Sequence, residues 1–204
     1  MTPFDVAGDP VGATPLDATD IAGLIPTWVA TRGDLDQVEQ ENIAKALVWS
    51  VAHGPETLAA LLSDDMLRSL HRRMFGDVWR WAGVYRMHDT NLGVHWPYIG
   101  TRVCDLVADV TAQTLDPECL TWSADELSVR FHHRLVTIHP FPNGNGRHAR
   151  FAADLLVGIL GEPPFTWGGA DLARVGSART RYLAALRHAD ERLDYRPLIE
   201  FARS

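Results

Sequence analysis

Apolar residues recur at the three- and four-residue spacing of an α-helix along most of the chain. Residues 34–53 begin with an acidic turn, stop before a Gly-Pro pair and place most of their apolar side chains on one side. The same spacing predicts further helices over 66–75, 123–138, from the glycines of the 144–146 segment to 159, and one or two more over 178–203. The pattern therefore indicates a mainly α-helical protein.

One segment has the two-residue alternation of a β-strand instead. Val94, Trp96 and Tyr98 alternate, and the turn-forming residues 90–93 separate them from residues 84–88. A strand pattern on the far side of a short turn is typical of a β-hairpin. Residues 1–20, by contrast, are rich in Pro, Gly, Thr and Asp without any period, which predicts an irregular arm. We therefore expect one small hairpin on a helical body.

The charge balance limits the classes of partner. The chain has 204 residues, enough for one well-buried core, and a formal net charge of -7. This excess of acidic residues argues against direct binding of nucleic acid or of an anionic membrane, so a bound phosphate has to be met by local cations. Cys104 and Cys119 are too few for a disulfide framework. Since neither a signal-peptide pattern nor an apolar run of membrane-spanning length is visible, we expect a cytoplasmic protein.

The segment from His139 to Arg150, HPFPNGNGRHAR, combines several elements of phosphate chemistry. It joins two predicted helices, and the second begins at glycines, where free backbone amides and the positive end of the helix dipole attract an anion. Arg147 and Arg150 lie one turn apart on that helix, where two guanidinium groups can grip successive phosphates. A neutral His139 at the rim of this nest could take the proton from an attacking hydroxyl. The pattern predicts a phosphoryl-transfer site.

The same segment resembles the signature of the Fic (filamentation induced by cAMP) family, His-x-Phe-x-(Asp or Glu)-Gly-Asn-Gly-Arg-x-x-Arg, at every defined position except Asn143. Two further stretches are similar to the family, FGDVWRWAGVYR and RYLAALRHADERLDYRPLIEFAR, so the resemblance runs from about Leu70 to Phe201. The exact residues of the motif also resemble those of a subgroup called mobile mystery protein B. Proteins of this subgroup are usually encoded beside a helix-turn-helix protein. The resemblance therefore implies a helix-turn-helix partner.

By this resemblance the fold is a Fic-type helical bundle with a helix–loop–helix active site and a small β-hairpin flap. Three parts are expected: an irregular N-terminal arm over 1–33, an N-terminal helical region with an inhibitory helix over 34–69, and the Fic core over 70–204. This division places the phosphate motif in the core and the regulatory element before it.

The activity that the resemblance implies is transfer of AMP from ATP to a hydroxyl side chain of another protein. His139 is then the general base and Phe141 a core anchor, and the hairpin at residues 86–99 holds the extended backbone of the target by strand addition. The nucleotide phosphates are expected on the nest and on the arginines of the motif: Gly144, Asn145, Gly146, Arg147 and Arg150.

Asn143 stands where the family signature has a carboxylate that binds metal. An amide oxygen can coordinate Mg²⁺ or Mn²⁺ but brings no charge, so the affinity for the metal should be weakened. Three outcomes follow from this difference: transfer with metal carried by ATP, use of another phosphate donor, or loss of transfer. The third outcome would leave a catalytically impaired Fic protein that binds a nucleotide or a partner.

The pair Glu41-Asn42 resembles the end of the inhibitory motif that holds many Fic proteins inactive, although Gln37 replaces the expected hydroxyl residue. The resemblance implies that Glu41 pairs with Arg150 and occupies the position of a distal phosphate. The alternatives are that Glu41 is a surface residue of an acidic helix, or that it activates water to remove AMP from a modified protein.

The nine histidines allow one further alternative, a metal hydrolase. Its candidate ligands are His132, His133, His139 and His148. Adjacent helical residues diverge in direction and no HExxH pattern is present, so this alternative ranks below the transferase.

Overall fold

The computed structural model describes residues 14–115, 121–169 and 176–204, most of which are helical. The longer helices are α2 (Arg32–His53), α4 (Asp64–Phe75), α5 (Ile99–Gln113), α6 (Ala124–Ile138), α7 (Asn145–Ile159), α8 (Ser177–Arg192) and α9 (Arg196–Arg203). The short ones are α1 (Ala18–Ile21), α3 (Leu58–Leu61) and the 3-10 turns η1 (Trp96–Tyr98) and η3 (Trp167–Gly169). The helices predicted from apolar spacing are confirmed, and the C-terminal tail contains two of them. None of the described helices is long and apolar enough to cross a bilayer.

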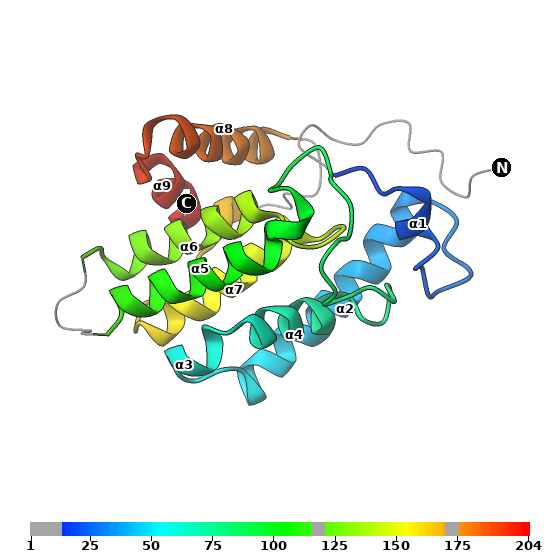
Figure 1. Cartoon of the computed structure of the whole chain (residues 1–204), viewed down its shortest axis with the longest axis horizontal. Helices are drawn as coiled ribbons and strands as arrows, with labels where there is room; N and C mark the ends of the chain where they lie inside the picture. The colour runs from blue at the N-terminus through cyan, green and yellow to red at the C-terminus, as the bar shows by residue number, and fades with distance from the viewer. Residues whose placement is uncertain (1–13, 116–120, 170–175) are drawn as a thin grey trace.

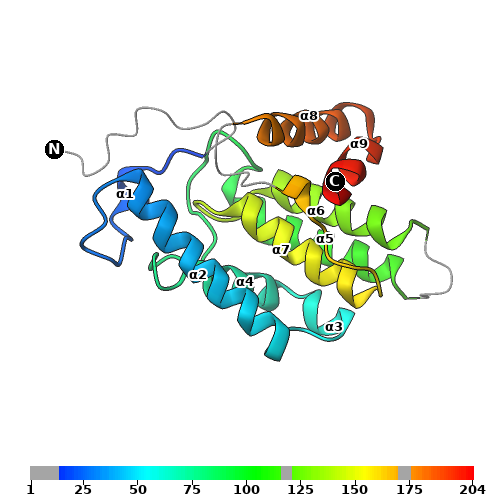
Figure 2. The ribbon, with the colours of Figure 1, turned by 180° about the vertical axis from the view of Figure 1, so that it is seen from behind.

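The helices form three groups, and both the front view of Figure 1 and the back view of Figure 2 show them in the same order from top to bottom. α5, α6 and α7 lie in the middle, α2, α3 and α4 cover one side, and α8 and α9 cover the other. The turn at residues 139–144 joins α6 to α7, and these two helices pack along each other. The turn that carries the phosphate motif is therefore anchored by the central helix pair.

Local capping explains where two of these helices begin. Thr31 accepts a hydrogen bond from the amide of Asp34, whose carboxylate accepts one from the amide of Thr31, and α2 starts directly afterwards. At α6, the Ser123 hydroxyl accepts a hydrogen bond from the amide of Glu126, while the Glu126 carboxylate pairs with Arg130. The cap at α6 is thus formed by its serine alone. Each such cap stabilises its helix by about 1 kcal/mol.

The buried face of α2 differs from the predicted apolar stripe. Leu35 and Val38 are buried, but Leu47 is 48% exposed. The same buried face instead includes two polar residues, Glu39 and Asn42, which are 2% and 5% exposed. Apolar spacing alone therefore located the helix correctly and misjudged which residues face the protein.

The predicted β-hairpin is not formed, and the described ranges contain no strand, only an isolated bridge between Leu24 and Trp79. Residues 84–95, here called the 84–95 loop, run irregularly. The amide of Arg86 donates to the carbonyl of Pro140 and that of Val94 to the carbonyl of Ile138, at 3.0 and 3.2 Å. Because these amides bond to the chain around the end of α6, they are not available for pairing one arm of the loop with the other.

The described part of the N-terminal arm is irregular apart from α1, and it is tied to the body. The indole of Trp81 donates to the carbonyl of Asp20, and the amide of Ile25 donates to the carbonyl of Val78. Residues 1–13 of the predicted arm lie outside the described residues. The division of the chain into three parts at residues 33 and 69 stays a prediction. In the structure, α2 from the second part lies in the same apolar cluster as α4 and α6.

Candidate active site

His139 ends α6 in a left-handed backbone conformation, with a φ of 54°, and its side chain is buried. Its Nδ1 atom lies 3.2 Å from the carbonyl oxygen of Val136. A carbonyl only accepts hydrogen bonds, so Nδ1 carries the proton of the neutral ring and Nε2 is unprotonated. Nε2 faces the hydroxyl of Thr14 at 2.7 Å. Burial lowers the pKa of His139 from 6.5 to about 4, which keeps the ring neutral at pH 7 and suits it to accept a proton.

The N-terminus of α7 provides an anion-binding nest directly after this turn. Gly144 has a φ of 80°, and a Cβ at this position would lie 2.6 Å from the ring of Phe75, so only glycine fits here. No side chain caps α7, a helix described over its whole length. The amides of its first turn lack intrahelical acceptors and therefore remain available to an anion, together with the positive end of the helix dipole.

Asn145, predicted as a residue of the phosphate nest, uses its side chain to hold the turn. The side-chain amide donates to the carbonyl of Phe141 at 2.7 Å, and its oxygen accepts from the amide of the same residue at 2.9 Å. Phe141 itself is fully buried against His71, as expected of a core anchor. The Asn145 side chain thus closes the turn, and only its backbone amide is directed to an anion.

The two arginines of the motif diverge although they lie one turn apart. Arg147 bonds to the carboxylate of Glu39 at 2.7 Å and packs over the ring of Phe75, whereas Arg150 lies over the ring of Tyr182 on α8. Of the two arginines, only Arg150 is therefore held on the α8 side of the site. Burial lowers the pKa of Arg179 there, and the nearby charge of Arg150 lowers it further.

The predicted contact between Glu41 and Arg150 is wrong for this structure. Glu41 is exposed and accepts a hydrogen bond from Gln37 at 3.0 Å, on the outer face of α2. Asn42 faces inward, where it donates to the carbonyl of Arg73 and accepts from the amide of Asp77. The Glu41-Asn42 pair therefore anchors α2 through its asparagine and leaves its glutamate in solvent.

Glu39 takes the inward position that was expected of Glu41. Its carboxylate bonds to Arg147 through one oxygen and to the indole of Trp79 through the other, each at 2.7 Å. The side chain is buried, so both bonds form where water competes little. α2 therefore reaches the phosphate motif through Glu39 and meets its first arginine.

The surroundings of Asn143 do not fit a magnesium ion held by the protein. The Asn143 amide oxygen accepts from the amide of Gly144 at 2.5 Å and lies 3.5 Å from a guanidinium nitrogen of Arg147. An uncharged oxygen beside a fixed cation is a poor ligand for Mg²⁺, which prefers carboxylates. The predicted weakening of a metal site at this position is consistent with these contacts.

The candidate ligands of the metal-hydrolase alternative do not converge. His132 bonds to the hydroxyl of Tyr182, His133 to Asp190 and His148 to the carbonyl of Leu67. Burial lowers the pKa of each of the three, so they are neutral side chains of the core. Among the described residues, the group with a spacing suited to a metal is Asp17, Asp20 and His88, which includes none of these histidines.

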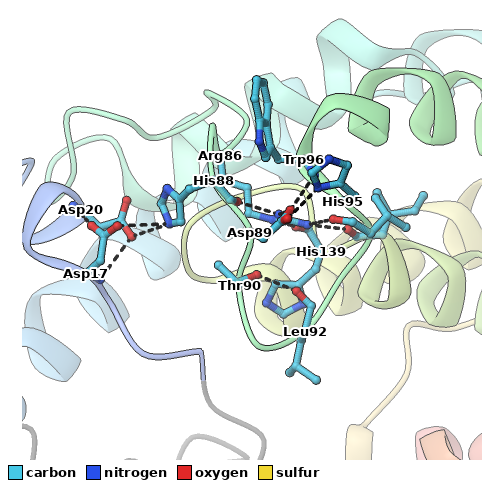
Figure 3. A network of polar contacts seen from close by, with 12 residues as sticks. Asp17, Asp20, Arg86, His88, Asp89, Thr90, Leu92, His95, Trp96 and His139 are labelled. Carbon is cyan, nitrogen blue, oxygen red and sulfur yellow. Dashed lines mark hydrogen bonds and ion pairs between the residues drawn. The ribbon is translucent and has the colours of Figure 1, made fainter.

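Arg86 fixes the 84–95 loop against the turn that carries His139 (Figure 3). The residue is 2% exposed, and its guanidinium donates to the carbonyls of His139, His88 and Val94. These bonds join both arms of the loop to the turn at His139. The orientation of the turn that carries His139 therefore depends on a buried arginine that the sequence motif does not include.

A cavity of about 450 Å³ lies over these groups. His139, the nest and Arg150 line it together with side chains of α8. Five arginines and two aspartates face it, so it is positively charged within an acidic protein. The charged side chains are Arg32, Asp36, Arg147, Arg150, Arg179, Arg187 and Asp190. Such a cavity suits a ligand with several negative charges.

Sequence reasoning missed three residues of this site: Thr14, Glu39 and Arg86. Thr14 belongs to an arm without any periodic signal, and Glu39 belongs to an acidic helix in which several carboxylates look alike. The sequence placed Arg86 at the start of the predicted hairpin and gave no other sign of its role. No local pattern could have found them, because each acts through a contact with a distant part of the chain.

The comparisons with known proteins agree on one family. Residues 61–157 match the sequence model of the Fic/DOC family. Protein adenylyltransferase fic-1 of Caenorhabditis elegans is 29% identical over 141 residues, which are 69% of this chain and 26% of that protein. Protein adenylyltransferase VbhT of Bartonella schoenbuchensis is 28% identical over 128 residues, 58% of this chain and 26% of that protein. The chain thus spans about a quarter of the length of these curated relatives.

Solved structures show the same fold. The BepC protein of Bartonella tribocorum, solved with bound AMPPNP, superimposes with a TM-score of 0.65 at 16% identity, covering 92% of this chain and 97% of that one. Membership of the mobile mystery protein B subgroup stays a prediction from the residues of the motif. Residues 61–157 are therefore similar in sequence to the Fic/DOC family, and the chain shares its helical fold with BepC.

Proposed function

We propose that this protein transfers AMP from ATP to a hydroxyl side chain of a target protein. The observation that carries the proposal is the unprotonated Nε2 of a buried, neutral His139 beside an uncapped helix N-terminus in a cationic cavity. Relatives of the chain are named protein adenylyltransferases, and BepC was solved with an ATP analogue. Both facts favour ATP as the donor.

His139 accepts the proton of the attacking hydroxyl in this proposal. The amides of the nest and the guanidinium of Arg150 hold the phosphates and offset the charge that develops on them. The positive φ of His139 and the bond from Arg86 to its carbonyl set the direction of the ring. Since Asn143 does not form a suitable protein site for Mg²⁺, any metal would arrive with the nucleotide, and no step depends on a metal ligand from this chain.

The test of this proposal is incubation with α-labelled ATP in Mg²⁺ or Mn²⁺, followed by gel analysis and intact mass measurement. Wild type should gain label on itself or on an added protein, and His139→Ala should gain none. Arg150→Met should lose most of the label because a phosphate grip is removed. Arg102→Met, at an exposed arginine that does not line this cavity, serves as the matched control. Label that persists in His139→Ala would refute the assignment of the base.

A second candidate, a binding protein without transfer activity, is favoured by Asn143 alone. The side-chain oxygen of Asn143 is directed to Gly144 and Arg147, so it contributes no charge to catalysis. Calorimetric titration with ATP distinguishes the two candidates. Binding of ATP without an adduct on any tested protein would favour this second candidate. Removal of AMP through Glu41 finds no support, because that carboxylate is exposed on the outer face of α2.

We also infer that α2 restrains the site, with Glu39 in the place predicted for Glu41. The Glu39 carboxylate neutralises the guanidinium of Arg147, which a donor phosphate would otherwise meet. Glu39→Gln should therefore raise labelling, and Glu41→Gln should not. Equal labelling in wild type and both variants would contradict a restraining role.

Target docking is proposed at residues 86–99, the segment predicted as a hairpin. Met87 and Leu92 are 70% and 41% exposed there and offer apolar contacts to an extended peptide. Met87→Asp should lower labelling of an added target and leave the labelling of the protein itself unchanged. A helix-turn-helix partner stays a proposal from the resemblance, to be tested by co-purification.

A further inference from the structure

The N-terminal arm brings a hydroxyl group of this same chain to the proposed base. Thr14 Oγ1 lies 2.7 Å from Nε2 of His139, although 125 positions separate the two residues. Because Nδ1 carries the ring proton toward the carbonyl of Val136, Nε2 accepts and the Thr14 hydroxyl donates. This contact is the one that an attacking hydroxyl makes with a general base before it reacts.

The arm next to Thr14 is held in place by the loop that also positions His139. The carboxylates of Asp17 and Asp20 lie 3.5 and 3.4 Å from Nε2 of His88 (Figure 3). His88 belongs to the 84–95 loop, whose Arg86 bonds to the carbonyl of His139. Asp17, three residues after Thr14, is thus anchored to the same loop that holds the backbone of His139.

The position of Thr14 leaves room for a nucleotide. Thr14 is half-buried and lines the cavity of about 450 Å³ together with the nest and Arg150. A donor whose phosphates lie on the nest would therefore share one cavity with the hydroxyl and the base. Proximity of this kind makes the reaction within one molecule much faster than a reaction between two molecules at ordinary concentration.

We propose that Thr14 is a modification site of this protein, which accepts AMP from its own active site. The inference rests on the proposed function. The Thr14 Oγ1 atom forms a bond to the α-phosphorus of ATP while the bond from that phosphorus to the oxygen of the β-phosphate breaks. The hydroxyl proton passes to Nε2 of His139, and pyrophosphate leaves with the electron pair of the broken bond. The products are Thr14 esterified with AMP and free pyrophosphate.

The experiment locates the adduct and follows its rate. Wild type is incubated with ATP and Mg²⁺, digested with trypsin and analysed by fragmentation of the 1–32 peptide, which contains five threonines. AMP is expected on Thr14. The adduct should be absent from Thr14→Val and His139→Ala and present in Thr14→Ser, which keeps a hydroxyl. Thr19→Val, which changes an exposed threonine of α1, is the matched control and should react like wild type.

The kinetics test whether the reaction takes place within one molecule. The rate constant for modification of Thr14 should stay the same over a tenfold dilution of the protein at fixed ATP. A rate constant that falls in proportion to the protein concentration would overturn the intramolecular step, because one molecule would then modify another.

Three further results would overturn the inference. A His139-dependent adduct on another residue, with none on Thr14, would refute the site and leave the proposed transferase function intact. Faster labelling of an added target by Thr14→Val, with Thr14 unmodified in wild type, would show that the hydroxyl blocks the site. Absence of an adduct on the protein and on every added polypeptide would refute the proposed function, and this inference would fail with it.

Discussion

The carboxylate of Glu39 lies 2.7 Å from the guanidinium of Arg147 and so joins α2 to the phosphate motif across 108 positions of sequence. The other oxygen of the same carboxylate accepts the indole proton of Trp79. Glu39 is buried, whereas the Arg147 side chain is 23% exposed. A single buried charge therefore ties three separate segments of the chain together.

Replacing Glu39 should lower the free energy of unfolding more than replacing an exposed residue of α2 does. Glu39→Gln leaves the guanidinium of Arg147 without its charged partner, and we expect a loss of roughly 2–3 kcal/mol. For a chain of this size that corresponds to a fall in Tm of roughly 5–10 °C. Thermal unfolding by circular dichroism measures it. Glu41→Gln is the control and should change stability by less than about 0.5 kcal/mol, because Glu41 is exposed. Equal effects of the two substitutions would show that the buried pair contributes little.

Arg86 should be required for the order of the 84–95 loop. Arg86→Lys keeps the charge but loses the planar set of donors that meets several backbone carbonyls, at an expected cost of roughly 2–3 kcal/mol. Hydrogen exchange should then become faster at the amides of Arg86 and Val94, which bond to the turn around His139. Arg102→Lys, at an arginine whose side chain is 61% exposed, should leave exchange unchanged. Unaltered protection in Arg86→Lys would mean that the loop is held by other contacts.

The buried histidines make stability depend on pH. Burial lowers the pKa of five of them in the folded protein, so below pH 6.5 the unfolded chain binds more protons than the folded one and stability falls with the pH. A histidine that is neutral in the folded protein and protonated in the unfolded chain contributes at most about 1.4 kcal/mol per pH unit. Asp154, whose pKa burial raises to about 7, acts in the opposite direction and offsets one of them. The five are His71, His132, His133, His139 and His148.

Urea unfolding at pH 7.5, 6.5 and 5.5 measures this dependence. The free energy of unfolding should change little between the first two values and drop by several kcal/mol at the third. A flat profile down to pH 5.5 would contradict the neutral state of these side chains. His148→Gln keeps a side chain that can bond to the carbonyl of Leu67, and it should make the profile less steep.

Asn143→Asp should strengthen metal-dependent transfer. The new carboxylate keeps the acceptor position toward the amide of Gly144 and adds a charged oxygen, the ligand type that Mg²⁺ prefers. We expect the Mg²⁺ concentration for half-maximal labelling to fall by roughly tenfold. Gln37→Glu adds the same charge on the exposed face of α2 and should have no effect. If Asn143→Asp required as much Mg²⁺ as wild type and Gln37→Glu, the side chain at position 143 would not bind the metal.

Local patterns were sufficient to predict the helices and the phosphate motif. Helices α2, α4, α6 and α7 follow from apolar spacing and from nearby turn residues, both of which act within a few positions. The nest needs only a glycine at the start of a helix, and Gly144 has the left-handed conformation that a glycine allows. These features are local, so the sequence by itself determined them.

The tertiary structure decided which side chains reach the site. Glu39 and Glu41 are about 200° apart around α2, so only one of them can face the motif, and the packing of α2 on α4 selects Glu39. Val94 has the strand pattern, but its amide bonds to the segment around His139. Thr14 meets His139 because distant contacts dock the arm. Long-range packing and backbone pairing depend on the whole fold, and they leave no periodic signal in the sequence.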